Sequence, residues 1–158
     1  MLDRSAYSAE NCSVARTLDL VGEKWTLLVL REAFYGVRRF DALQGNLGIA
    51  RNVLAARLQT LVEAGVMTRV PYREAGSRQR FEYRLTEQGR ALLPSILALL
   101  EWGDTYLADE DGPPVVVTHR ECGAAVHVDL TCEAGHGGLT ARDTDPVPGP
   151  GARLRAIS

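Results

Sequence analysis

Apolar residues from Ser13 to Phe34 recur three and four positions apart, and the pattern is interrupted at Gly22. This is the spacing of helices that bury one face, so it predicts two short helices. A third short helix is expected from Arg39 to Gly45, followed by a glycine turn at Gly48.

The next segment, IARNVLAARLQTLVEAGV, has the clearest amphipathic helical pattern in the chain. The stripe predicted to face inward consists of Leu54, Leu58, Leu61 and Val62. The face predicted to point outward consists of Asn52, Ala55, Ala56, Gln59 and Glu63. Arg51 and Arg57 lie on the borders between these faces, and Gly65 is expected to end the helix.

Two strand-like runs follow, from Val66 to Tyr72 and from Arg80 to Leu85, and the second alternates apolar with polar residues. The connection between them, REAGSRQ, is a Gly/Ser turn that carries Arg73 and Arg78. These features predict a β-hairpin with a basic tip.

A long helix is expected to begin at Thr86 as its N-cap and to be kinked by Pro94. Its apolar surface is wider than one stripe, because Leu93, Leu97, Trp102 and Tyr106 add to the leucines at helical spacing. A monomer of this size has difficulty covering such a surface. We therefore expect a partner helix from a second subunit.

The sequence changes character beyond Asp109, where ADEDGPP is typical of a linker. The predicted organisation is a domain over residues 1–108, a small β-hairpin or ribbon-like extension over 109–142, and a disordered tail over 143–158. The expected fold class is α+β, mainly α.

The formal net charge of −2 is unevenly distributed along the 158 residues. Residues 1–100 hold 14 Lys and Arg against 10 Asp and Glu, whereas residues 101–158 hold 4 against 10. From Arg38 to Arg90 there are 10 cations against 5 anions, and all 10 are arginines. Guanidinium groups suit phosphate oxygens and guanine edges. On charge alone, a solvated surface that uses arginine is the alternative interpretation.

Several classes of protein do not fit the sequence. The longest apolar stretch, near Ile96 to Leu100, is far shorter than the roughly 20 residues of a membrane span. The polar N-terminus lacks the pattern of a secretory signal, so a cytoplasmic protein with reduced thiols is expected. There is no Gly-rich phosphate loop and no nucleophile motif, so we expect neither an enzyme nor a required cofactor.

The order of the predicted elements favours binding to double-stranded DNA. The major groove admits one helix, which is presented by a shorter supporting helix and a tight turn. Residues 39–64 supply that order, and the basic hairpin of 66–85 can lie along the neighbouring minor groove or phosphates. The combination is that of a winged helix-turn-helix domain.

Specific motifs strengthen this interpretation. They are Cys12, Gly-x-Lys-Trp at 22–25, the pair Arg39-Phe40, Leu-x-x-Arg-Leu-x-x-Leu at 54–61, Tyr-x-Leu-Thr-x-x-Gly at 83–89 and Trp102-Gly103. Over residues 11–107 the chain resembles the HxlR family of bacterial transcriptional regulators, a branch of the MarR-like winged-helix proteins.

The resemblance implies a homodimer joined through its N- and C-terminal helices, with two recognition helices in successive major grooves. Half-sites would then lie roughly 34–36 Å apart. It also implies regulation of nearby genes, with repression the expected mode. Two positions depart from the family pattern: Ser13 replaces a proline after the cysteine, and Ala50 replaces a Ser or Thr at the start of the recognition helix.

The DNA contacts are assigned by position. Arg51 and Asn52 are the candidates for base contact, because Arg pairs with guanine and Asn with adenine. Arg73, Ser77, Arg78 and Arg80 are candidates for phosphates or the minor groove, and Arg38 and Arg39 for the backbone at the supporting helix. Arg57 borders the core, so a structural ion pair and a phosphate contact are both open for it.

Three sensor sites are considered. Cys12 begins the first helix near Arg16, where its thiol is a candidate redox sensor. The alternative, which the sequence favours, is that Cys12 packs as a small apolar residue at the dimer interface. A small-molecule effector is the second possibility, in the apolar cleft between the dimer helices near Trp25, Trp102 and Tyr106, although such residues more often belong to a core.

The third is a structural zinc site formed by His119, Cys122, Cys132 and His136. Its spacing is atypical, His127 offers alternative pairings, and a small hairpin can also pack without metal.

An adaptor that uses the winged helix to bind protein rather than DNA is the alternative function. Such an adaptor would not need Arg51, Asn52, Arg73 and Arg78 on one surface, whereas a DNA reader does.

Overall fold

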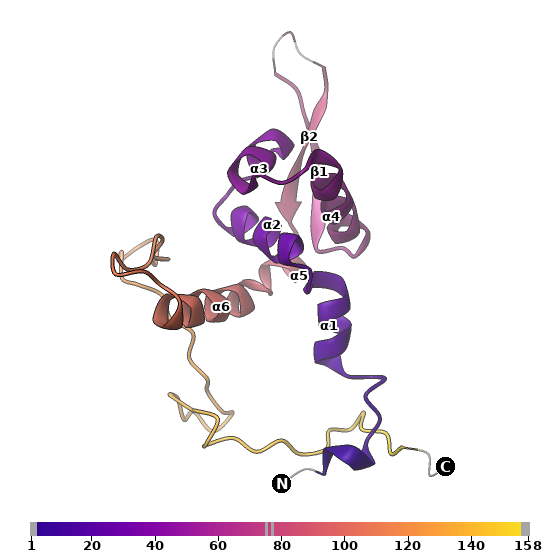
Figure 1. Ribbon diagram of the computed structural model, residues 1–158, viewed down its shortest axis with the longest axis vertical. Coiled ribbons are helices and arrows are strands. Elements are labelled where there is room, and N and C mark those ends of the chain that lie inside the picture. Colours follow the sequence, from indigo (N-terminus) through magenta and orange to yellow (C-terminus); the bar gives the residue numbers. More distant parts are fainter. Residues whose placement is uncertain (1–2, 75, 77, 156–158) are drawn as a thin grey trace.

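The computed structural model describes residues 3–74, 76 and 78–155. It is mainly helical with one two-stranded antiparallel sheet (Figure 1). The elements are a 3-10 turn Arg4–Ala6, α1 Ser13–Val21, α2 Lys24–Phe34, α3 Phe40–Leu47, α4 Arg51–Glu63, β1 Met67–Tyr72, β2 Arg80–Leu85, α5 Glu87–Arg90 and α6 Leu93–Tyr106.

The core lies between α2, α3, α4 and the base of the hairpin. On α4, Leu54, Leu58 and Leu61 are completely buried, and they pack with Leu30 of α2 and Leu43 of α3. The predicted inward stripe is therefore confirmed, and the five residues predicted to point outward are all exposed. Helical periodicity located this core because one face of α4 packs against α2 and β1.

Two glycines set the turns on either side of α4. Gly48 ends α3 with φ of +60°, and Gly65 follows α4 with φ of +73°. At the second turn the amide of Val66 donates to the carbonyl of Leu61 at 2.9 Å. Glycine adopts this left-handed conformation without a Cβ clash, so both turns lie where the sequence predicts, although α3 extends two residues beyond its predicted end at Gly45.

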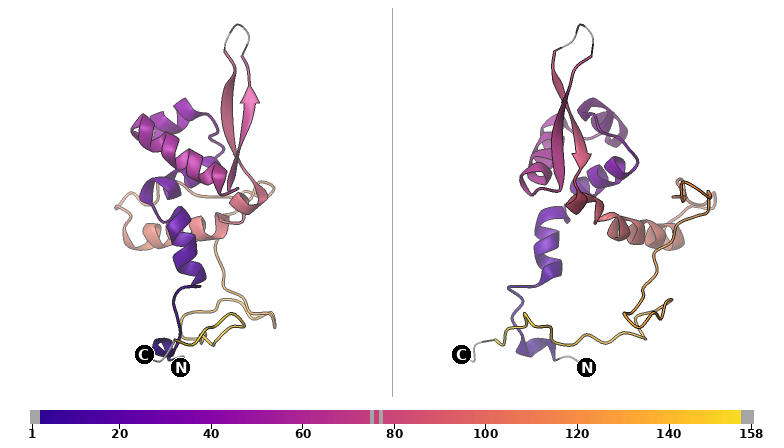
Figure 2. Two further views of the ribbon diagram at one scale, coloured as in Figure 1. Left: turned by 90° about the vertical axis from the view of Figure 1, so that its right-hand side faces the viewer. Right: turned by 180° about the vertical axis from the view of Figure 1, so that it is seen from behind.

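The hairpin β1–β2 forms a long wing that projects away from the helices (Figure 2). Its register pairs Met67 with Leu85 and Tyr72 with Arg80. The segment before α3 joins its edge, because Arg39 bridges to Glu82 and the amide of Tyr83 donates to the carbonyl of Arg38 at 2.8 Å. The wing is thus fixed directly to the start of the supporting helix.

The predicted single helix from Thr86 onward is wrong, because the structure has two helices. Thr86 does cap α5, since its hydroxyl accepts from the amide of Gly89 at 3.1 Å. A separate helix, α6, then starts at Leu93, with Pro94 in its first turn. Proline is accommodated there because the first amides of a helix have no carbonyl partner within it. Pro94 therefore begins a helix instead of kinking one.

The C-terminal extension does not form the predicted β-hairpin. Thr118 and Ala125 make one isolated antiparallel bridge, and no strand is assigned between 109 and 155. The segment expected to be a disordered tail runs back to the N-terminal segment (Figure 1). There Tyr7 bridges to Leu154, and the side-chain amide of Asn11 donates to the carbonyl of Gly151 at 2.6 Å.

Within the described part of the chain, none of the helices has the length and apolar character needed to cross a membrane.

Candidate nucleic-acid interface

The N-terminus of α4 presents the two residues predicted to contact bases. Arg51 and Asn52 are both exposed in its first turn. The preceding N-cap, Ala50, has extended backbone angles but no side-chain oxygen to accept a hydrogen bond from the helix amides. These amides therefore lack a side-chain cap, and they can donate to a ligand oxygen.

A buried carboxylate sets the position of the supporting helix. Glu32 of α2 is 6% exposed, and its Oε2 accepts from the side-chain amide of Asn46 on α3 at 2.9 Å. Its Oε1 accepts from Arg31 at 2.7 Å. Because a buried carboxylate is costly unless it is paired, these contacts favour one orientation of α3 on α2. No local sequence pattern predicts this role.

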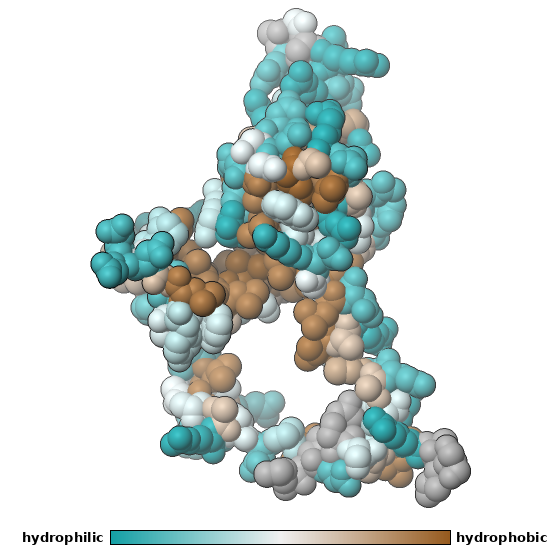
Figure 3. All heavy atoms as spheres, in the orientation of Figure 1, coloured by the Kyte–Doolittle hydropathy of each residue, from teal (hydrophilic) through white to brown (hydrophobic). Residues whose placement is uncertain are grey.

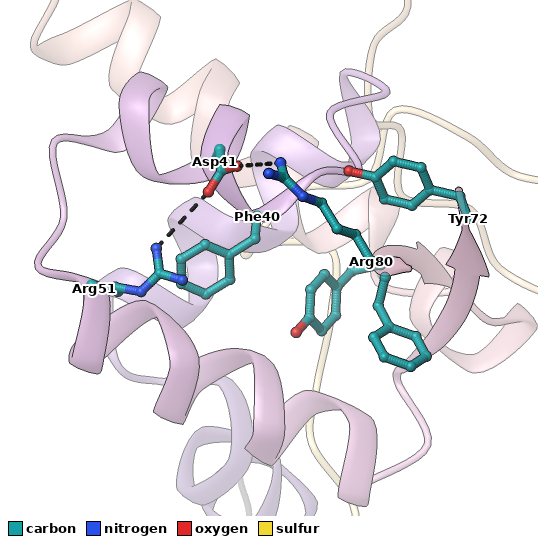
Figure 4. Close-up of a pocket in the computed structure, with 7 residues that line it drawn as sticks. Phe40, Asp41, Arg51, Tyr72 and Arg80 are labelled. Carbon is teal, nitrogen blue, oxygen red and sulfur yellow. Dashed lines mark hydrogen bonds and ion pairs between the residues drawn. The ribbon is translucent and has the colours of Figure 1, made fainter. Parts of the chain in front are cut away.

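Asp41 joins the recognition helix to the wing (Figure 4). Its two carboxylate oxygens lie 3.9 Å from Nη1 of Arg51 and 3.2 Å from Nη1 of Arg80. The three residues line a pocket of about 450 Å³ together with Phe40, Tyr72, Phe81 and Tyr83. The structure therefore brings together two of the predicted DNA contacts, from α4 and β2, around a residue that the sequence analysis missed.

Aromatic rings support the arginines on this surface. The guanidinium of Arg51 lies 4.8 Å from the centre of the Phe40 ring, and that of Arg39 lies 4.7 Å from the Tyr72 ring. Arg39 also pairs with Glu74 at 2.6 Å. When a guanidinium stacks on a ring, the N–H groups at the edge of the guanidinium stay free for a second partner. Stacking therefore orients these side chains without neutralising their positive charge. Only the Arg39-Phe40 motif hinted at this in the sequence.

The remaining predicted contacts are distributed along the wing and α4. Arg38, Arg73 and Arg78 are exposed, whereas Ser77 lies outside the described residues. Arg57 is partly buried on α4, and its Nε is buried with no hydrogen-bond partner. Within the described ranges no carboxylate lies within ion-pair distance of Arg57, so the structural ion pair considered for it is not formed.

We expect the substitution Asp41→Asn to strengthen binding to every duplex several-fold. Asp41, Arg51 and Arg80 are 68%, 73% and 61% exposed, so their pairs are weak and a phosphate can displace the carboxylate. Removing the carboxylate also removes its repulsion of DNA phosphates. Fluorescence-anisotropy titrations at two salt concentrations measure this effect, with Asp104→Asn on α6 as the control. Weaker binding by Asp41→Asn would show that Asp41 positions the arginines instead of restraining them.

The sensor residues occupy separate places in the monomer. Cys12 is partly buried at the N-cap of α1. Trp25 packs against the core, whereas Trp102 and Tyr106 are exposed on α6 with ring centres 5.4 Å apart. An effector cleft between the dimer helices near these three residues stays a prediction.

The candidate zinc ligands form two separate pairs. Nδ1 of His119 lies 3.2 Å from Sγ of Cys122, and Nδ1 of His136 lies 3.3 Å from Sγ of Cys132. The backbone amide of His136 holds the pKa of the Cys132 thiol below its ordinary value. No group of three or more His, Cys, Asp or Glu side chains suited to a metal occurs in the part of the chain that the structure describes. Zinc binding by all four residues stays a prediction.

Fold and surface together define a winged helix-turn-helix protein with a basic, exposed recognition helix. Residues 20–111 match the model of the HxlR-like helix-turn-helix family. The chain belongs to this family, and it is an HTH-type transcriptional regulator, not an enzyme.

Individual relatives agree with this assignment. The HTH-type transcriptional regulator Rv3095 of Mycobacterium tuberculosis is 50% identical over 153 residues, which are 97% of this chain and 96% of Rv3095. A crystal structure of PA1607, a candidate transcription factor, has a TM-score of 0.77 at 42% identity and covers 89% of this chain and 96% of its own.

Shorter structures resemble part of the chain. The oxidised redox regulator HypR has a TM-score of 0.56 at 31% identity, over 62% of this chain and all of its own. Structures described as MarR-family regulators are also similar, so the expected relationship to that group is confirmed.

Proposed function

We propose that this protein is a sequence-specific repressor that binds double-stranded DNA as a homodimer. The observation that carries the proposal is the shared surface of α4 and the wing, where Arg51 and Arg80 lie around Asp41 and Asn52 is exposed next to Arg51 in the chain. The first turn of α4 would meet base edges in the major groove. The wing arginines would meet phosphates or the minor groove beside it.

The same surface supports an exchange of partners on DNA. In the free protein, the carboxylates of Asp41 and Glu74 pair with Arg51, Arg80 and Arg39. Phosphate oxygens would replace these carboxylates, and the guanidinium planes would stay on their aromatic supports. The arginines would thus be positioned before DNA arrives.

The homodimer is supported by uncovered apolar side chains on α1 and α6. Val14 and Leu18 of α1 and Leu99, Trp102 and Tyr106 of α6 are all more than half exposed. Hydrophobic surface gathers over these two helices in Figure 3. A second copy would bury this surface and place two recognition helices on one duplex. A dimer that spans two major grooves would block access to a promoter.

We further propose that thiol chemistry at Cys12 or a small effector modulates this activity. The similarity to the redox regulator HypR supports the first route. Cys12 lies at the N-cap of α1, one of the two helices proposed to form the dimer, so its modification would alter the spacing of the recognition helices. The sharpest comparison is DNA binding by the parent and by Cys12→Ser before and after treatment with hydrogen peroxide.

Substitutions at the two ends of the surface test the DNA-binding proposal. We expect Arg51→Ala to weaken operator binding about tenfold and to relax base preference, because a bidentate base contact is lost. Arg78→Ala should weaken binding to all duplexes and lower the salt slope by about 1, because a phosphate contact is lost. Anisotropy titrations against the promoter upstream of the protein's own gene and a scrambled duplex measure both effects.

Arg142→Ala is the matched control, since it removes an exposed arginine outside the helix-turn-helix domain. If both test variants bound every duplex as well as the parent, the proposed surface would be wrong. If the parent bound no duplex even at low salt, the adaptor function would be favoured.

A further inference from the structure

A larger groove than the pocket around Asp41 lies at the base of the wing. It has a volume of about 870 Å³, within the roughly 300–1,000 Å³ range of small-molecule sites. Its walls come from the C-terminal end of α2, the base of β2, α6 and the extension. Apolar lining is provided by Phe34, Leu93, Ile96, Leu97, Leu100, Val117 and Val126.

The charged residues of this groove are mostly cations. Four arginines line it, Arg38, Arg84, Arg90 and Arg120, together with a single carboxylate, that of Glu121. Arg84 is paired with Glu82, and Arg90 donates to the carbonyl of Leu85 at 2.9 Å.

Arg38 and Arg120 differ from these two arginines. Neither forms an ion pair with a carboxylate of the described residues. They belong to segments far apart in the sequence, Arg38 to the segment before α3 and Arg120 to the extension. An apolar groove flanked by two such guanidinium groups complements a ligand with an apolar body and a negative group.

The extension forms its wall of the groove because it is fixed to α6 at one carboxylate. Glu101 accepts from the amide of Val128 at 3.1 and 3.2 Å, and its Oε1 lies 3.0 Å from Nδ1 of His127. Within the extension, the amide of Val126 donates to the carbonyl of Val117 at 2.9 Å. The turn that carries Arg120 is therefore held against α6.

We propose that this groove binds a small amphipathic organic anion, with its apolar body on α6 and its negative group between Arg38 and Arg120. An effect of this ligand on DNA binding rests on the proposed function, because Arg38 belongs both to this groove and to the proposed DNA-binding surface. The carbonyl of Arg38 also accepts from the amide of Tyr83 on the wing. An anion held by Arg38 would compete with DNA phosphates for the same cation.

The test uses 8-anilinonaphthalene-1-sulfonate as the anionic probe and N-phenyl-1-naphthylamine as its neutral counterpart. Fluorescence titrations with the full chain, without DNA, give the Kd of each probe. We expect Arg120→Gln and Arg38→Gln each to weaken the anionic probe about tenfold, because each removes a charge-assisted contact. Arg142→Gln, which removes an arginine of the extension outside the groove, should leave it unchanged, and the neutral probe should respond to none of the variants.

Unchanged binding of the sulfonate to Arg120→Gln and Arg38→Gln would overturn the proposal. An equal loss of both probes would also overturn it, because the groove would then lack anion recognition. If only Arg38→Gln weakened binding of the sulfonate, the proposed position of the negative group beside Arg120 of the extension would be overturned. Since these titrations contain no DNA, they are independent of the DNA-binding proposal, and Arg120→Gln should still bind the operator with the parent's affinity.

Discussion

Replacing Gly89 by alanine should lower the free energy of unfolding by about 3 kcal/mol. A Cβ at this position would lie 2.1 Å from the carbonyl oxygen of Val66 and 3.1 Å from Cδ2 of Leu85. The nearest atom belongs to the backbone, which cannot rotate away as a side chain can. The conflict must therefore displace α5 from the turn between α4 and the wing.

The neighbouring hydrogen bonds make such a displacement costly. The hydroxyl of Thr86 accepts from the amide of Gly89 and donates to the carbonyl of Gly65 at 2.6 Å. The amide of Thr86 donates to the carbonyl of Val66 at 3.1 Å. A shift of α5 would break several of these bonds together, and each buried group left unpaired adds to the loss.

Urea unfolding followed by circular dichroism measures the change, with Gly45→Ala as the control. Gly45 lies within α3, and a Cβ there would meet nothing within 4 Å. Alanine should therefore stabilise the protein by about 0.5–1 kcal/mol at position 45, because it is the better helix former. Similar effects at both glycines would contradict the close approach at Gly89.

The substitution Leu99→Glu should convert the proposed dimer to a monomer and weaken operator binding by about 100-fold or more. Leu99 is 56% exposed on the same face of α6 as Trp102 and Tyr106. A carboxylate buried there against a second copy without a partner would cost several kcal/mol, and each 1.4 kcal/mol is about tenfold in affinity. Each monomer would then reach only one half-site.

Sedimentation velocity and anisotropy on the same samples measure mass and affinity together. Thr105→Glu adds the same charge to α6 outside the stripe of Leu99, Trp102 and Tyr106, so it should leave both properties unchanged. Thermal unfolding shows whether each variant is folded. A folded Leu99→Glu protein that remained a dimer would place the interface elsewhere.

Local patterns were sufficient to locate the elements of the DNA-binding domain. The alternation in RFEYRL predicted β2 with its observed bounds, and the basic Gly/Ser turn predicted the wing. At Thr86 the cap was predicted correctly, but the helix that follows it is short. A proline such as Pro94 can lie inside a kinked helix or in the first turn of a new helix. Only the packing of α6 on α2 and the extension decides between these two locations.

The sequence by itself determined the helix order up to the wing, the inward stripe of α4, the glycine turns and the exposure of Asn52. These depend on periodicity and local conformation, which neighbouring residues encode. The tertiary structure alone decided that Asp41 contacts both Arg51 and Arg80, that Glu32 is a buried link to α3, and that Arg38 and Arg120 share a groove. The residues brought together in this way are 10 to 82 positions apart. No local pattern records which distant side chains meet, because that depends on how the elements pack.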